Sequence, residues 1–216
     1  MSVSASSTPI VRTPIGPPSL ADCAGRAGGC KTARQVLGDR AGPERLPVSP
    51  MLERVGIDGL KEPLLDYSAI DIAARPIGRT EIGNYIPHRD QFALLDHIIW
   101  DAPTGAQGIA IWNVGMEEFW VKGHFPGMPL LPGVLMVEAG AQLGAYLFNL
   151  RWERPKVAAF TRIESCVFRA SVQPGDELLI LANEVNVNER RFVSDVQGLV
   201  RGKVAFGARI SGMTLT

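Results

Sequence analysis

The longest apolar stretch of the chain, residues 134–148, predicts a central helix. It reads VLMVEAGAQLGAYLF, so nearly every position around the helix would be apolar. A helix that is hydrophobic on all sides belongs inside a domain, enclosed by other elements. Its small residues, Gly140 and Gly144 among them, would let the backbone of a sheet come close, which offsets their poor helix propensity. Pro155 follows, so the helix should end between residues 149 and 154.

Shorter apolar runs on both sides of this helix predict strands. They lie at 93–100, 108–113 and 118–121 before the helix, and at 157–168, 178–187, 191–200 and 203–214 after it. Short polar turns separate the last three runs, as in an antiparallel meander, and a helical turn is predicted at 82–85. One long buried helix with a set of antiparallel strands indicates an α+β fold whose sheet wraps around the helix.

The N-terminal part has a different character. Residues 1–50 are rich in Ser, Thr, Pro, Gly, Ala and Arg without periodicity, which predicts a disordered extension or a true start at Met51. A transit peptide is the alternative, because Arg and Ser are frequent and acids scarce, although no amphipathic helix is evident. Residues 51–78 should be partly ordered, with short helices at 51–55 and 60–65 and no assigned role, before the main domain of residues 79–216.

Charge and cysteine content exclude several classes of protein. Lys+Arg and Asp+Glu both number 22, and a net charge of zero argues against a dedicated nucleic-acid binder. Three cysteines are too few and too irregularly spaced for a disulfide framework or a zinc site, which favours a reducing, cytoplasmic setting. No apolar run reaches the roughly 20 residues of a membrane span, and the N-terminus lacks the apolar core of a secretory signal.

The loop just before the helix carries the candidate chemistry. Three prolines in the stretch GHFPGMPLLPG, residues 123–133, make it stiff, and it presents one histidine, His124. Pro132 suits the first helical turn, and the bare backbone N–H of Gly133 would lie at the positive end of the helix dipole. Glu138 is the one acid inside the apolar helix, where it should be held in its protonated form. We interpret His124 and Glu138 as an acid–base pair, against the alternatives of a capping histidine and a structurally paired acid.

At these residues the chain resembles a known family. The sequence GHFPGMPLLPGVLMVEAGAQ, residues 123–142, is similar to the motif of FabZ-type (3R)-3-hydroxyacyl-[acyl carrier protein] dehydratases, which have the hotdog fold. The segment IPHRDQFALLD, residues 86–96, and the segments IESCVFR and VQPGD, residues 163–169 and 172–176, resemble flanking parts of the same family. The likeness covers about residues 80–215.

The resemblance implies removal of water from a (3R)-3-hydroxyacyl thioester to give the trans-2-enoyl thioester. His124 would be the base and Glu138 the acid, and the Gly133 N–H would stabilise the thioester oxygen. The two side chains at one site would come from different subunits of a homodimer, which relatives often assemble further into a hexamer. No metal and no other cofactor is implied.

The resemblance also implies an acyl tunnel and a docking surface for acidic acyl carrier protein. The tunnel candidates are Phe125, Leu135, Phe160 and Phe168, each of which would equally suit a plain core. The docking candidates are Arg151, Arg154, Lys156, Arg162 and Arg169, for which solvated surface charge is the simpler interpretation. The chain departs from the usual family pattern at Val167, at Asp90-Gln91 and at Glu164, which bears on carrier recognition and chain length.

Three other functions compete with the dehydratase. A hotdog acyl-thioesterase would hydrolyse the same bond, and a bifunctional dehydratase/isomerase of FabA type would carry aspartate at position 138. A non-enzymatic acyl-binding module would gain nothing from an acid inside the helix. Gln142, one turn after Glu138, is expected either to bridge backbone or water or to take part in catalysis.

Overall fold

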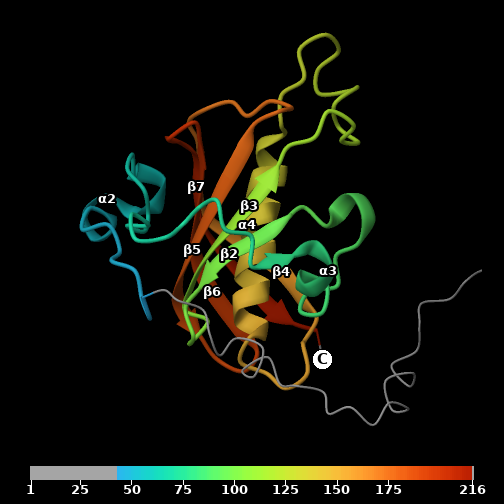
Figure 1. The fold of residues 1–216 in the computed structure, drawn as a ribbon. Coiled ribbons are helices and arrows are strands. Elements are labelled where there is room, and N and C mark those ends of the chain that lie inside the picture. The colour runs from blue at the N-terminus through green and yellow to red at the C-terminus, as the bar shows by residue number, and fades with distance from the viewer. Residues whose placement is uncertain (1–42, 216) are drawn as a thin grey trace, which may run out of the picture.

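The computed structural model describes residues 43–215, which are organised around a seven-stranded antiparallel sheet (Figure 1). The sheet order is β1-β2-β3-β5-β6-β7-β4. The strands are β1 Ile77–Gly78, β2 His97–Asp101, β3 Gln107–Asn113, β4 Ala158–Phe168, β5 Glu177–Val187, β6 Arg191–Val200 and β7 Lys203–Thr214. The predicted meander of the last three apolar runs is confirmed, because β5, β6 and β7 pair in sequence.

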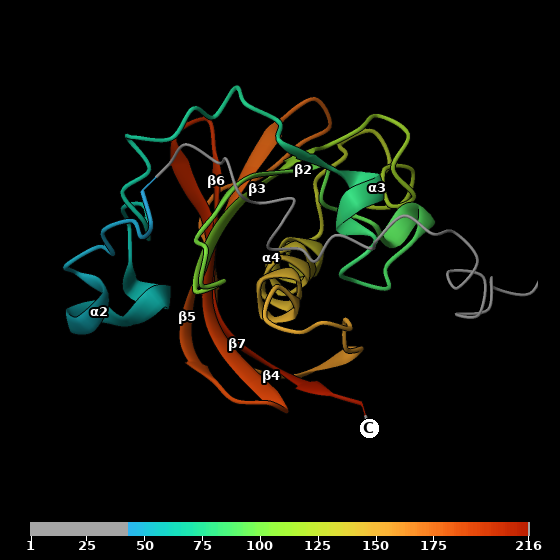
Figure 2. The ribbon, with the colours of Figure 1, turned by 60° about the horizontal axis from the view of Figure 1, so that its bottom comes forward.

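The central helix α4, Gly133–Asn149, lies in the concave side of the curved sheet (Figure 2). Its residues from 139 to 149 are all buried, as the apolar pattern predicts. A Cβ on Gly140 would lie 2.8 Å from Val196 on β6, and one on Gly144 would lie 3.1 Å from the Phe192 ring. The two glycines therefore allow the close approach of helix and sheet that the sequence indicated.

The N-terminal segment covers the opposite face of the sheet. Helix α2, Leu52–Gly59, lies on the other side of the sheet from α4 (Figure 2). The segment buries five side chains, Leu46, Ile57, Leu60, Leu64 and Leu65, against strand residues such as Trp100, Ile109, Leu179 and Leu181. Residues 178–182 on β5 are consequently buried on both faces.

Two buried glutamines bind the backbone of this covering segment, residues 43–66. Gln107 accepts a hydrogen bond from the Leu46 N–H at 2.8 Å and donates to the Leu46 carbonyl at 3.1 Å. Gln197 accepts from the Leu64 N–H at 2.7 Å and donates to the Glu62 carbonyl at 2.9 Å. The sheet thus supplies polar partners that a segment with little secondary structure of its own needs when it is buried.

Several local predictions differ from the structure. Residues 60–65 are irregular rather than helical: Leu65 bridges Val48, and Gln197 binds the backbone of Glu62 and Leu64. Residues 118–121 form turns instead of a strand, with the Val121 N–H bonded to the Glu118 carbonyl at 3.0 Å. The run at 93–100 becomes a strand only from His97, after a short 3-10 helix, η2 Asp90–Phe92.

Residues 43–50, which the sequence assigned to the N-terminal extension, contact the sheet through Leu46. The predictions for residues 1–42 lie outside the described residues. The short helix α3, Arg79–Ile82, lies close to the helical turn predicted at 82–85. Among residues 43–215, none of the helices has both the length and the apolar character to cross a membrane.

Candidate active site

His124 lies in the segment between β3 and α4, which extends past the end of the sheet (Figure 1). Phe125 and Met128 exchange backbone hydrogen bonds of 3.1 and 2.9 Å, and the Leu130 N–H donates to the His124 carbonyl at 2.8 Å. The Leu131 N–H bonds to the Val172 carbonyl at 2.8 Å and so ties the loop to the segment after β4. The loop is therefore held by its own backbone as well as by its prolines.

One contact fixes the chemistry of the His124 ring. Its Nδ1 lies 2.7 Å from the carbonyl oxygen of Leu130, and a carbonyl can only accept a hydrogen bond. Nδ1 must therefore carry the hydrogen, so the neutral ring has its lone pair on Nε2. The Phe125 ring stacks on the imidazole with centroids 4.1 Å apart, which further restrains its orientation. The His124 ring is thus held in one orientation, with Nε2 as its basic nitrogen.

Glu138 lies in the second turn of α4 with its side chain 22% exposed. Its Oε1 accepts a hydrogen bond of 2.9 Å from Nε2 of Gln142, one turn further along the helix. The Gln142 amide also donates to the Phe92 carbonyl at 2.8 Å and accepts from the Leu94 N–H at 3.1 Å. Gln142 is therefore a bridge between Glu138 and the backbone of residues 92–94, which is one of the two roles expected for it.

Within one chain the two predicted catalytic side chains are not partners. Among residues 43–215, no hydrogen bond or ion pair joins His124 to Glu138. The histidine beside Glu138 is instead His88, whose Nε2 lies 3.3 Å from Oε1. In the sequence, the one signal for His88 is its place between a proline and an arginine within the motif-bearing segment 86–96.

Gly133 begins α4, with Pro132 as the residue just before the helix. Its N–H has no hydrogen-bond partner within the described part of the chain, as expected for the first helical residue. A Cβ at this position would lie 2.7 Å from the Phe168 ring, so only glycine permits that ring to cover the helix start. The Gly133 N–H therefore lies beside the Phe168 ring.

The four tunnel candidates do not form one group. Phe125 stacks on His124 and Phe168 covers Gly133, so both lie at the candidate site, where they are 47% and 49% exposed. Leu135 packs on the main core. Phe160 lies on β4 eight residues before Phe168, about 26 Å away at roughly 3.3 Å per strand residue. Phe160 therefore belongs to the far end of that strand.

The five docking candidates do not form one patch either. Arg151 pairs with Glu184 at 2.7 Å and donates to the Leu147 carbonyl, so its guanidinium already has partners within the chain. Lys156 precedes β4 and Arg169 follows it, so the length of this strand separates them. Arg154 and Arg162 are exposed.

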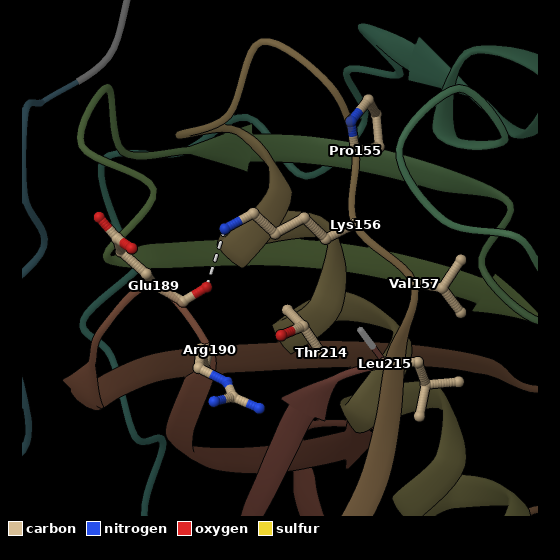
Figure 3. Close-up of a pocket in the computed structure, with 7 residues that line it drawn as sticks. All are labelled: Pro155, Lys156, Val157, Glu189, Arg190, Thr214 and Leu215. Atoms are coloured by element: carbon tan, nitrogen blue, oxygen red, sulfur yellow. Dashed lines mark hydrogen bonds between the residues drawn. The ribbon is translucent and has the colours of Figure 1, made fainter.

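A hollow of about 620 Å³ lies at the start of β4 (Figure 3). Lys156 and Arg190 both line it. The Lys156 ammonium group donates to the Glu189 carbonyl at 2.8 Å and lies 3.7 Å from the Trp152 ring centroid. Basic side chains therefore gather at this end of β4, whereas Arg169 lies beyond the other end of the strand.

A curved antiparallel sheet around one long buried helix defines the hotdog class. The family model for the FabA-like domain matches residues 86–209. The chain is 38% identical over 133 residues to the 3-hydroxyacyl-[acyl-carrier-protein] dehydratase FabZ of Geobacter metallireducens. The aligned region covers 60% of this chain and 88% of that protein. The chain belongs to the FabA-like family and, within it, to the FabZ-type members.

A solved structure shares the fold. The dehydratase heterocomplex ApeI:P from Xenorhabdus doucetiae aligns with a TM-score of 0.55 and 16% sequence identity, over 62% of this chain and 91% of that one. The matched family region begins after the covering segment of residues 43–66. That segment is therefore an addition to the family domain.

Proposed function

We propose that the protein is a hydro-lyase that converts (3R)-3-hydroxyacyl-[acyl carrier protein] to the trans-2-enoyl form in type II fatty acid synthesis. The observation that carries the proposal is the fixed ring of His124, because the Leu130 carbonyl on Nδ1 leaves Nε2 as an oriented base. Family membership supplies the substrate class, since the FabZ relative is named for this reaction. The enzyme would work in the cytoplasm, where the free thiol of Cys166 stays reduced.

The proposed reaction needs two proton transfers, one by each side chain. His124 Nε2 takes the proton from C2 of the acyl chain, and Glu138 gives a proton to the 3-hydroxyl group. The C3–O bond breaks, the C2–C3 double bond forms and water leaves. The Gly133 N–H, at the positive end of the helix dipole, stabilises the negative charge on the thioester oxygen. Transfer of the proton from His124 back to Glu138 through solvent restores the starting state.

A two-chain site follows from the same proposal, because His124 and Glu138 are not partners within one chain. Strand β4 is the natural contact: it has a single sheet neighbour, β7, among residues 43–215. Its exposed apolar residues include Phe160, Ile163 and Phe168, which are 41–49% exposed. An open apolar edge of this length favours pairing with another strand. In a two-fold dimer, two β4 edges would pair antiparallel and place each His124 loop beside the partner's helix.

Complementation tests both the reaction and the two-chain site. We expect His124→Ala and Glu138→Gln each to abolish formation of the conjugated enoyl product from a 3-hydroxyacyl carrier protein. After mixing under conditions that exchange subunits, half of the dimers are mixed and each holds one intact site, so about a quarter of wild-type activity should return. Sites built within single chains would give no recovery.

The product distinguishes the competing functions. Release of a free carrier thiol without the enoyl product would identify a thioesterase. Movement of the double bond to C3 would identify the bifunctional dehydratase/isomerase. Assembly of three dimers into a hexamer, which the resemblance also implies, is tested by the solution mass of the full chain.

A further inference from the structure

We infer that His88 is a positioning residue for the acid, and that it directs the proton of Glu138 to the oxygen that faces the substrate. This inference rests on the proposed dehydratase function and extends it to a residue outside the predicted pair. Its basis is the 3.3 Å contact between His88 Nε2 and Glu138 Oε1, two side chains that are 25% and 22% exposed.

Oε1 of Glu138 is the oxygen that receives donors. Gln142 Nε2–H already donates to it at 2.9 Å, and His88 Nε2 approaches the same atom. An oxygen that accepts two hydrogen bonds is a poor site for the acid's own hydrogen, which is therefore placed on Oε2. A general acid must hold its proton on the oxygen within reach of the leaving hydroxyl. Two donors on Oε1 would keep the proton of the carboxyl group on Oε2, the oxygen that must reach the hydroxyl.

The other ring nitrogen indicates which tautomer His88 adopts. Nδ1 is buried and has no hydrogen-bond partner within residues 43–215. A hydrogen on a buried nitrogen without an acceptor is costly, so Nδ1 is the bare nitrogen and Nε2 carries the hydrogen. His88 then presents a donor to Glu138. At 3.3 Å the two side chains are at ion-pair distance rather than in a formed hydrogen bond. Catalytic hydrogen bonds are often long without substrate and tighten only in the complex.

The backbone around His88 is fixed from both sides. The Arg89 guanidinium donates to the carbonyls of Gly83, Ile86 and His88 at 2.7–2.8 Å. Gln142 ties residues 92–94 to α4 through two further hydrogen bonds. The imidazole is thus carried on a clamped segment against the helix that bears the acid. Such a support is what a precise catalytic geometry requires.

Substitution at position 88 tests the donor directly. His88→Gln places an amide N–H near the position of Nε2, whereas His88→Asn places it near Nδ1, and His88→Phe keeps the ring shape without a donor. With 3-hydroxyacyl carrier protein as substrate, we expect His88→Phe and His88→Asn to lower kcat roughly 10- to 100-fold, the order expected for a misplaced catalytic group, with KM within about twofold. His88→Gln should recover most of the lost kcat. His97→Gln, a substitution of the other histidine with an unpartnered buried Nδ1, is the matched control and should retain wild-type kcat.

Nitrogen-15 NMR supplies a measurement independent of turnover. The chain has three histidines, so each ring is assigned by the signals lost on its substitution. We expect His88 as the Nε2–H tautomer, with an Nε2 resonance that moves in Glu138→Ala. If the wild type is active, any one of three results would overturn this inference alone. These are full kcat in His88→Phe, a kcat of His88→Gln no higher than that of His88→Asn, or a His88 signal unchanged in Glu138→Ala. An inactive wild type would instead overturn the dehydratase assignment, while the NMR result would still decide whether His88 contacts Glu138.

Discussion

Removal of the Gln197 side chain should detach the covering segment from the outer face of the sheet. In Gln197→Ala, the Leu64 N–H and the Glu62 carbonyl lose their partners at 2.7 and 2.9 Å. Leu64 has no exposed surface and Gln197 has none either, so water is not at hand to replace the amide. The change therefore leaves a buried donor, the Leu64 N–H, and a part-buried acceptor, the Glu62 carbonyl, without partners.

The expected loss of stability follows from these two groups. A buried polar group without a partner costs about 1–3 kcal/mol, so roughly 2–6 kcal/mol is the upper range for the two groups, of which the Glu62 carbonyl is only part-buried. Local rearrangement lets water reach some of this backbone, so we expect the lower half of the range, about 2–4 kcal/mol. At the same time the segment should open more often, because its link to β6 is lost and its apolar contacts alone must hold it.

Urea unfolding and amide hydrogen exchange measure the two effects separately. The unfolding midpoint of Gln197→Ala should fall with little change in the m-value, and exchange at the Leu64 amide should speed up. Gln173→Ala is the matched control, since this exposed glutamine makes no side-chain hydrogen bond within residues 43–215. A loss below about 0.5 kcal/mol in Gln197→Ala, the level of an ordinary surface substitution, would refute the reasoning.

Three further results are expected. Arg151→Ala should destabilise the fold by about 1–3 kcal/mol in a denaturant titration, because it leaves the largely enclosed Glu184 without its partner at 2.7 Å. The KM for carrier protein should change little. A large rise in KM at normal stability would instead identify Arg151 as a docking residue. Burial opposes ionisation of Asp176, but hydrogen bonds from Arg201 and the Gln173 N–H outweigh it and lower its pKa, so the pair stabilises the fold at neutral pH and this contribution is lost as pH falls below about 4. Arg201→Ala should thus cost about 0.5–1 kcal/mol at pH 7 and less at pH 3 by thermal unfolding; an equal cost at both values would contradict the assignment. Burial raises the pKa of the Cys166 thiol, so alkylation followed by peptide mass analysis should be slower at pH 7 than for a cysteine in unfolded chain and should speed up with rising pH; rapid labelling at pH 7 would contradict this.

The main sheet was predictable because its strands carry local patterns. Strands β5, β6 and β7 agree with the predicted runs to within one residue, since long apolar stretches alternate with short polar turns. The run at 178–182, Leu-Leu-Ile-Leu-Ala, carries a further signal. A strand that is apolar at consecutive positions must be covered on both faces, and the covering segment does this.

The candidate site was only partly accessible from the sequence. The proline-rich loop and the acid in an apolar helix single out His124 and Glu138, because each is unusual in its local setting. The contact of His88 with Glu138 joins residues 50 positions apart, and no local pattern specifies it. The docking candidates are close together in the sequence, but several of them lie at opposite ends of β4 in the structure. No local pattern indicates this separation.

The sequence alone determined the central helix, the strands β3 to β7, and one stiff loop that presents a histidine before the buried helix. These features depend on periodicity, proline geometry and side-chain polarity within short windows. The tertiary structure decided which groups meet: Gln107 and Gln197 hold the N-terminal segment, and His88 lies beside the acid. Such pairings arise from the packing of elements distant in sequence, where a buried polar group binds whichever partner the fold brings within reach.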